Sequence, residues 1–331
     1  MQDRGHSTWA VANRLFAFGL AGNLPGQPLI WVTGNLRDYQ RGRKGIRAFL
    51  GHAVLNSAAV NAFDLSPAVL EATVNRLRRG PAALWVGYAS ALHEVARYIE
   101  RTAMAVQPQK AICCTSDMLY HEMRIRMEHV FGCRVFNRYG CKEIGDMACE
   151  CDAHDGLHVL PWQSIVEILD DRGRPAPHGE IGHVVASTLH NYSMPLLRFD
   201  TGDMASLVDE PCSCGRSWPR LARVQGRFAD AFRCRDGTLV DEGFFTALLL
   251  ERPWVDRFQL VQEELNHVTI NVVAMEQPPS DGETAEIVSA VSSRMGADCV
   301  VVVNFLTDIP ALPSGKYRYT VCMLDDHEDG A

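Results

Sequence analysis

The order of apolar and polar positions over residues 1–140 predicts helices and strands that follow one another in turn. Short apolar runs are typical of buried strands, and apolar positions that recur every three or four residues are typical of helices that bury one face. Ser66 and Pro67 favour a helix start, and Gly80 favours its end. The predicted elements are, in order, a helix at 7–20, a strand at 29–32, a helix at 67–80, a strand at 83–86, a helix around 92–99, a strand at 111–114, a helix at 119–130 and a strand at 134–137.

Strands and helices that alternate in this way form a parallel sheet with right-handed crossovers. In such sheets, ligands bind beyond the carboxyl ends of the strands. Those ends are followed by the segments 87–90, 115–117 and 139–140. We therefore expect polar clusters in these segments to face one crevice.

The pattern changes beyond residue 157. Strands at 165–169 and 183–188, joined through a turn that begins at 170, predict a smaller and mostly antiparallel β subdomain. We expect this subdomain and the parallel sheet to form one large domain, residues 1–227.

After residue 227 the pattern changes again. Strands at 267–274 and 299–306 flank a helix at 283–295, and the Pro- and Gly-containing segment 278–282 is expected to be a loop. The fold class is therefore α/β: a large domain with a parallel sheet flanked by helices and a small β subdomain, followed by a small α+β C-terminal lid domain at 228–331.

Composition narrows the class of partner. The chain has 331 residues and a net charge of −8, so its surface as a whole should repel nucleic acid and anionic membrane. No apolar stretch approaches the roughly 20 residues that span a bilayer, and the N-terminus lacks the apolar core of a signal peptide. We therefore expect a cytoplasmic protein whose 11 cysteines stay reduced.

Four short motifs carry the chemistry. They lie at 139–143, 198–203, 226–230 and 313–316, and their order and spacing resemble an adenylate-forming enzyme, one that joins a carboxylate to AMP. The resemblance is greatest to the phenylacetate–CoA ligase and CapK-like branch. Taken singly, each motif also fits a turn or an exposed loop, since Gly and Asp favour turns by themselves.

The resemblance implies a role for each matched residue. Tyr139 and Gly140 would hold the adenine by stacking, and Glu143 would help to bind Mg²⁺. Asp203 would accept hydrogen bonds from both ribose hydroxyls, a task that suits a carboxylate because it has two acceptor oxygens. Arg227 would face the ribose or the phosphate.

Two more residues follow from the last motifs. Asp230 matches the hinge between the two domains, and Lys316 matches the lid lysine that bridges the carboxylate and the α-phosphate, where charge builds in the transition state. Arg227, Glu143 and Lys316 are thus the expected catalytic residues.

The acyl pocket is expected near the ends of the predicted strands. Its candidate residues are Trp85, Gly87, Tyr88 and Ser90. Thr115, Ser116 and Asp117 are expected near the adenine or the reacting carboxylate. The alternative for Trp85 and Tyr88 is that they pack in the core, as apolar aromatic residues at strand ends usually do.

The sequence departs from the family pattern at two places. The glycine-rich Ser/Thr-Gly-Thr-Thr-Gly phosphate loop is absent from the chain, which starts just downstream of the position expected for it. Lys142 also stands where a hydroxyl residue usually precedes Glu143. A lysine supplies a cation but not a cradle of backbone N–H groups, so we expect weaker binding of ATP than of AMP or an acyl-adenylate.

Two cysteine pairs and a histidine indicate a metal site. By the pattern of the resembled branch, the ligands are Cys151, His158, Cys212 and Cys214, which would form a closed structural zinc site with no open position for catalysis. Cys149 and His154 are the substitutes, and buried reduced thiols are the alternative.

The leading function is ATP-dependent activation of a carboxylic acid, in the resembled branch an aryl acid. Transfer would follow to CoA, a carrier pantetheine or an amine. The alternative is a non-catalytic or partly catalytic homologue that binds AMP or acyl-adenylate, or an accessory protein; adenylyl transfer to another group is a third. The branch also allows a homodimer, of which the sequence shows no interface.

Overall fold

The computed structural model describes most of the chain in two compact units, residues 1–224 and 225–331. The described residues are 3–34, 56–227, 231–240, 242–250, 252–275, 279–309 and 318–324. The sequence predicted a change of domain after residue 227, within the same stretch of chain. Each unit is described by itself below.

The first unit is built on a parallel sheet. Its strands lie in the order β2-β1-β3-β4-β5, and β3 is hydrogen-bonded between β1 and β4. Their bounds are β1 Leu29–Thr33, β2 Ser57–Asn61, β3 Leu84–Tyr88, β4 Ala111–Thr115 and β5 Val135–Cys141. The sequence analysis predicted four of these strands and missed β2.

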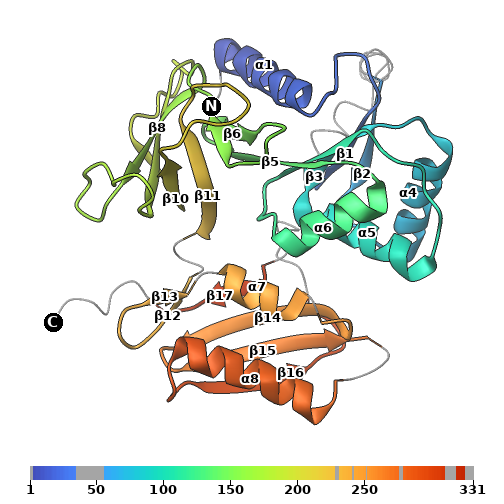
Figure 1. The fold of residues 1–331 in the computed structure, drawn as a ribbon, viewed down its shortest axis with the longest axis vertical. Helices are drawn as coiled ribbons and strands as arrows, with labels where there is room; N and C mark the ends of the chain where they lie inside the picture. Colours follow the sequence, from blue (N-terminus) through green and yellow to red (C-terminus); the bar gives the residue numbers. More distant parts are fainter. Residues whose placement is uncertain are drawn as a thin grey trace. The chain divides into compact units, whose positions relative to one another are not determined.

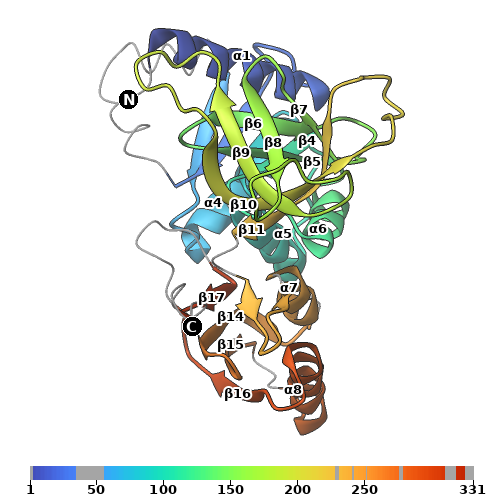
Figure 2. The same ribbon diagram turned by 90° about the vertical axis from the view of Figure 1, so that its left-hand side faces the viewer.

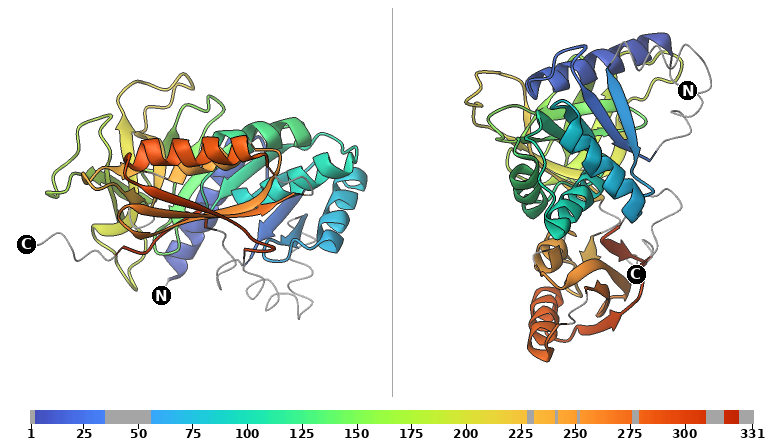
Figure 3. Two further views of the ribbon diagram at one scale, coloured as in Figure 1. Left: turned by 90° about the horizontal axis from the view of Figure 1, so that it is seen from below. Right: turned by 90° about the vertical axis from the view of Figure 1, so that its right-hand side faces the viewer.

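Helices cover both faces of this sheet (Figures 1 and 3). The helices are α1 Arg4–Leu20, α4 Pro67–Arg79, α5 Ala89–Thr102 and α6 His121–Phe131. Leu84 and Val86 of β3 pack with Phe18 of α1 on one face. Trp85, which points the other way because side chains alternate along a strand, lies 5.9 Å from the ring of Phe131 in α6.

Strand β5 continues beyond the parallel sheet into an antiparallel one (Figure 2). The order β5-β6-β7-β11-β10-β9-β8 completes one 11-stranded sheet. The added strands are β6 Gly145–Glu150, β7 Leu157–Val159, β8 Ser164–Leu169, β9 Gly182–Thr188, β10 Phe199–Val208 and β11 Arg220–Arg227. The predicted β subdomain is therefore present, but it shares its backbone hydrogen bonding with the parallel sheet.

Two of the predicted element boundaries were wrong for reasons that the observed contacts explain. The strand predicted to end at Asn137 runs on to Cys141, because β6 pairs with its second half. The predicted loop at 278–282 ends early, since Ser280 caps helix α8 and exchanges hydrogen bonds with Glu283 in a capping box.

The second unit is a four-stranded sheet in the order β16-β15-β14-β17, with helix α8 across one face (Figure 3). Its elements are β12 Phe232–Arg233, β13 Leu239–Val240, α7 Glu242–Leu250, β14 Val255–Glu264, β15 His267–Ala274, α8 Asp281–Met295, β16 Val300–Phe305 and β17 Thr320–Cys322. Phe245 of α7, Ile287 of α8 and Leu260 of β14 share one buried apolar cluster. This is the small α+β arrangement that the sequence predicted.

Within the described ranges, no helix combines the length and the apolar character that crossing a membrane requires.

Candidate functional site

The carboxyl ends of β3 and β4 lie side by side and carry the first polar cluster. Tyr88 pairs with Thr115, so the segments that follow the two strands start at the same edge of the sheet. Helix α5 begins directly after β3. The Asp117 carboxylate, which follows β4, accepts hydrogen bonds from the backbone N–H of Ala89 at 2.6 Å and of Ser90 at 3.0 Å, and from the Ser90 hydroxyl.

Asp117 therefore caps the N-terminus of α5 and ties the end of β4 to the end of β3. The neighbouring Ser116 has a φ of 76°, in the left-handed region that non-glycine residues rarely adopt. Such strain occurs often at functional sites. The prediction that Ser116 and Asp117 lie near a nucleotide stays a prediction, and the observed contacts give Asp117 a structural role.

The predicted acyl-pocket residues do not all lie in one place. Trp85 is fully buried, and its indole N–H donates to the side-chain carbonyl of Gln109 at 2.9 Å. It is a core residue, as the alternative interpretation stated, and it is removed from the pocket. Gly87 lies inside β3, where a Cβ atom would come within 2.7 Å of the Cβ of Val32.

Tyr88 and Ser90 remain as pocket candidates. Tyr88 is half-buried at the end of β3, and its ring centroid lies 6.0 Å from that of Phe63. Phe63 follows β2, and the sequence analysis missed it because it missed that strand. Its exposed ring could have been inferred only once β2 was placed beside β1.

Strands β5 and β6 form a hairpin that contains Tyr139, Gly140 and Glu143. Pairing shifts by one residue between Tyr139 and Gly140, which marks a β-bulge. Gly140 is required there because a Cβ atom would lie 2.9 Å from the Cα of Asp146. Glu143 is exposed in the turn that joins the strands, a position from which a carboxylate can reach a ligand.

The hairpin turn is hydrogen-bonded to a chain of buried amide side chains that the sequence analysis missed. Gln163 donates to the Ile144 carbonyl at 2.9 Å and accepts from Asn13 of α1, which in turn accepts from the indole of Trp162. Asn13 and Gln163 are both buried. Buried amides that satisfy one another in this way hold a turn in one position.

Asp203 lies on a second β-bulge. The pairing of β10 with β9 shifts between Asp200 and Met204, and Gly202 between them has a φ of 76°. The Asp200 carboxylate accepts from the Gly202 N–H at 2.8 Å. The Thr-Gly-Asp motif is therefore a bulge inside a strand and not a simple turn, and a bulge redirects the side chains that it carries.

The structure brings Tyr139 and Asp203 into contact. The Tyr139 hydroxyl donates to Oδ2 of Asp203 at 2.8 Å and lies 3.2 Å from the hydroxyl of Thr201. Burial and, next, the charge of Asp203 raise the pKa of Tyr139 well above its usual value. The phenol therefore stays protonated and remains a donor.

Three of the predicted residues cannot be placed. Asp230 and Lys316 lie outside the described residues, and Arg227 is described only as the last backbone position of β11. Their predicted roles as hinge, lid lysine and nucleotide-binding arginine stay predictions.

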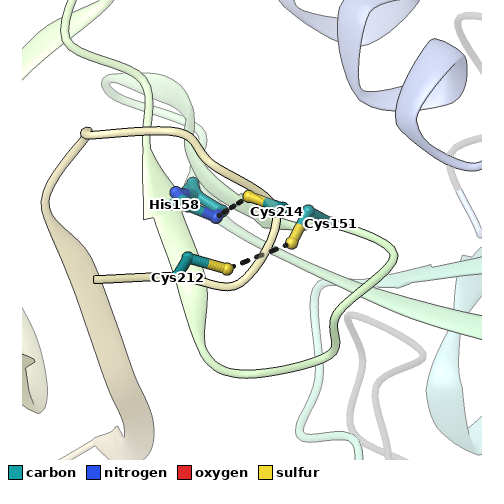
Figure 4. A group of neighbouring side chains, drawn as sticks. All are labelled: Cys151, His158, Cys212 and Cys214. Atoms are coloured by element: carbon teal, nitrogen blue, oxygen red, sulfur yellow. Dashed lines mark hydrogen bonds between the residues drawn. The ribbon is translucent and has the colours of Figure 1, made fainter. Parts of the chain in front are cut away.

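The four predicted metal ligands form a cluster (Figure 4). Their ligand atoms all lie within 4.8 Å of one another. The Cys151 and Cys212 sulfurs are 3.7 Å apart, and the Cys214 sulfur is 3.3 Å from Nε2 of His158. Three of the four residues are buried. Separations of this size suit the corners of a tetrahedron around a zinc ion with thiolate and imidazole ligands.

The cluster joins two parts of the antiparallel sheet. Cys151 follows β6 and His158 lies on β7, whereas Cys212 and Cys214 lie in the connection between β10 and β11. Burial lowers the pKa of His158, which favours the neutral, ligating imidazole.

The two substitute ligands point elsewhere. Cys149 is buried against Ala17 and Leu160. His154 contacts the Glu150 carboxylate through Nδ1 at 3.1 Å. Neither belongs to the cluster found among the described residues.

Comparison with known proteins finds relatives of one kind for this chain. Residues 233–322 match the family model of the CapK C-terminal domain. A phenylacetate–CoA ligase of Thermus thermophilus is 32% identical over 143 residues, which cover 42% of this chain and 32% of the ligase. Protein CapK of Staphylococcus aureus is 23% identical over 271 residues, covering 81% of this chain and 59% of CapK. The matches thus span about a third of the ligase and less than two thirds of CapK.

Solved structures share the fold. A 2-hydroxyisobutyryl-CoA ligase in complex with 2-HIB-AMP superposes with a TM-score of 0.74 at 21% identity, over 96% of this chain and 70% of the ligase. The anthranilate CoA ligase AuaEII in complex with anthranoyl-AMP gives a TM-score of 0.65 at 16% identity, over 93% and 61% of the two chains. The chain is thus similar to phenylacetate–CoA ligases and to protein CapK, its residues 233–322 match the CapK C-terminal domain, and it shares the fold of adenylate-forming ligases.

Proposed function

We propose that this protein activates a carboxylic acid with ATP to give an acyl-adenylate. The observation that carries the proposal is the pairing of Tyr139 with Asp203 beside the carboxyl edge of the parallel sheet. These two residues come from separate motifs of the adenylate-forming pattern. Relatives named phenylacetate–CoA ligases and fold neighbours solved with acyl-AMP support the same reaction.

In the proposed reaction the acid carboxylate attacks the α-phosphate of ATP and pyrophosphate leaves. Asp203 would hold the ribose hydroxyls and Glu143 would hold Mg²⁺, an ion that favours carboxylate and phosphate oxygens. Lys316 would stabilise the charge that builds on the transferred group. CoA, a carrier thiol or an amine would then attack the acyl-adenylate and release AMP.

An aryl acid is the proposed substrate class. The aromatic pair Tyr88 and Phe63 stands where the acyl group is expected, and rings of this kind favour offset or edge contacts with an aromatic ligand. Relatives that are named phenylacetate–CoA ligases support the same class.

ATP–pyrophosphate exchange with a panel of aryl and alkyl acids tests this function. We expect exchange with at least one aryl acid, and its loss in Lys316→Ala. Lys110→Ala is the matched control. Lys110 directly precedes β4 and contacts the side chain of Gln27, so this variant should keep its exchange activity. Absence of exchange with every acid, despite binding of AMP, would contradict the ligase and favour a homologue that only binds the nucleotide.

We also propose that the Cys151, His158, Cys212 and Cys214 cluster binds a structural zinc ion. All four positions are filled by protein, so no open position is left for catalysis. The zinc content of the purified protein, measured by atomic emission, should be near one ion per chain.

The two neighbouring cysteines give a matched pair of variants. Cys151→Ala should lose most of the zinc and lower the melting temperature, whereas Cys149→Ala should keep the zinc because Cys149 packs outside the cluster. The reverse result would move the site to the substitute ligand. Zinc-free wild-type protein with unchanged stability would show that the cluster is a set of buried thiols.

A further inference from the structure

The contact between Tyr139 and Asp203 joins strands that are not neighbours in the sheet. Tyr139 lies on β5 and Asp203 on β10, and three strands separate them in the sheet order. Tyr139 packs against the apolar clusters between these strands. The antiparallel part of the sheet therefore curls far enough to bring the phenol hydroxyl to the carboxylate.

Backbone irregularities adjoin both residues of this contact. The pairing of β5 with β6 shifts directly after Tyr139, with Met147 of β6 as the extra residue, and the pairing of β10 with β9 shifts around Gly202. Both partners of the hydrogen bond thus lie where the regular ladder is interrupted.

The hydrogen bond has a defined direction. The Thr201 hydroxyl donates to the Val184 carbonyl at 3.0 Å, so its oxygen is left as an acceptor. It accepts from the Asp203 N–H at 3.3 Å. A carboxylate cannot donate, and the single phenol proton takes the shorter contact, which is the one to Asp203.

We propose that Tyr139 is a positioning residue for ribose recognition, whose hydroxyl holds the Asp203 carboxylate in the orientation that accepts the two ribose hydroxyls. The proposal rests on the proposed function, in which Asp203 binds the ribose. The last torsion of an aspartate side chain has a broad distribution, and a hydrogen bond to one carboxylate oxygen narrows it. A carboxylate that is fixed before binding loses less conformational entropy when the nucleotide arrives.

This role differs from contact with the adenine. A ring that only stacks would be replaced by phenylalanine without loss. A phenol that orients Asp203 would not, because phenylalanine keeps the ring and removes the donor.

The test compares the affinities of AMP and 2′,3′-dideoxy-AMP, measured by calorimetry for wild type and Tyr139→Phe. We expect AMP to bind about tenfold more weakly to the variant, the size of effect given by one hydrogen bond to a charged group. Dideoxy-AMP, which has no ribose hydroxyls, should bind both proteins about equally. In the background of Asp203→Asn, Tyr139→Phe should add little.

Other outcomes overturn the inference. If Tyr139→Phe binds both nucleotides more weakly by the same factor, Tyr139 acts through its ring. If its affinity for AMP is unchanged, the hydrogen bond does not contribute to binding. If wild type binds AMP no better than dideoxy-AMP, the proposed contact of Asp203 with the ribose is wrong. This outcome is distinct from the one in which Asp203 binds the ribose but Tyr139 does not position it. Should Tyr139→Phe not fold, 3-fluorotyrosine at this position keeps the hydroxyl with a stronger donor. The ratio of the two affinities must then change, and an unchanged ratio overturns the proposal.

Discussion

At the residue scale, one glycine shows how closely the parallel strands are packed. Gly87 pairs with Val32 on one side and Cys114 on the other. A Cβ atom at this position would meet the backbone and side chain of Val32 at distances that real contacts do not reach. Neither neighbouring strand can move away without losing ladder hydrogen bonds, so strain cannot be relieved locally.

Replacing Gly87 by alanine should therefore destabilise the protein by about 1–3 kcal/mol, the usual range for overpacking a core. Urea unfolding of the purified variant measures this. Gly19→Ala is the matched control, because Gly19 is an exposed residue of α1 with no atom within 4 Å of the added methyl. That variant should be more stable than wild type by about 0.5–1 kcal/mol, since alanine loses less entropy in a helix. Equal stability of the two variants would contradict the proposed strain.

Single residues of the site were predictable where a sequence motif also contains residue types that bind a metal. Cys151, His158, Cys212 and Cys214 were named as a set and lie together. The direct hydrogen bond of Tyr139 to Asp203 was not predicted, because it depends on the irregular pairing around Asp203 and on the curl of the sheet. No pattern of apolar and polar residues encodes a curl, which results from packing over the whole subdomain.

At the element scale, the packing of α5 against α6 buries an ionisable ring. His93 of α5 is 3% exposed, and Nη1 of Arg126 lies 2.8 Å from its Nε2. Burial, together with the charges of Arg126 and Arg97, lowers the pKa of His93 to about 3. The ring is therefore neutral in the folded protein and accepts a hydrogen bond from Arg126.

This arrangement makes stability depend on pH. Between pH 6.5 and about 3 the unfolded chain binds a proton at His93 and the folded chain does not, so stability falls as the pH falls. The slope from this one group approaches about 1.4 kcal/mol per pH unit below its unfolded pKa. His93→Gln keeps an acceptor for Arg126 but does not titrate, so its unfolding free energy should fall less between pH 6.5 and 5.

The check is urea unfolding at several pH values in that range. His129→Gln serves as the control, because His129 is exposed on α6. It should follow the wild-type slope. If His93→Gln also follows it, the ring is protonated in the folded state and the inferred burial effect is absent.

Elements were predictable where the apolar pattern was long or bounded by clear stop signals. Helix α4 begins at Pro67 and ends before Gly80 as predicted. Strand β2 was missed because Ser57–Asn61 contains mostly small residues, and only its parallel pairing with β1 makes it a strand. The second half of β5 was missed for a related reason, since its partner β6 contains Cys149 and Glu150 and shows little alternation.

At the scale of the whole molecule, the two units have separate cores. The cluster around Phe258, Leu260 and Ile270 draws all its members from residues 232–322. The four-stranded sheet of the second unit includes no strand of the first. A unit with its own core and its own hydrogen-bonded sheet has what is needed to fold alone.

We therefore expect the fragment 225–331, expressed by itself, to give a dispersed amide NMR spectrum and a sigmoidal urea transition. In the full chain, calorimetry should resolve two transitions. Phe258→Ala should lower the unfolding free energy of the second unit by roughly 3–5 kcal/mol, as is typical of a buried phenylalanine, and should shift only that unit's transition. Leu92, which is also buried, lies in the first unit, so Leu92→Ala should shift only the transition of the first unit. Such independence is what a mobile C-terminal domain requires, because a domain that moves between steps of a reaction cannot depend on one fixed interface for its fold. If either variant shifts both transitions, or if the fragment is unfolded, the two cores are coupled, and the proposal that the C-terminal unit acts as a lid loses its physical basis.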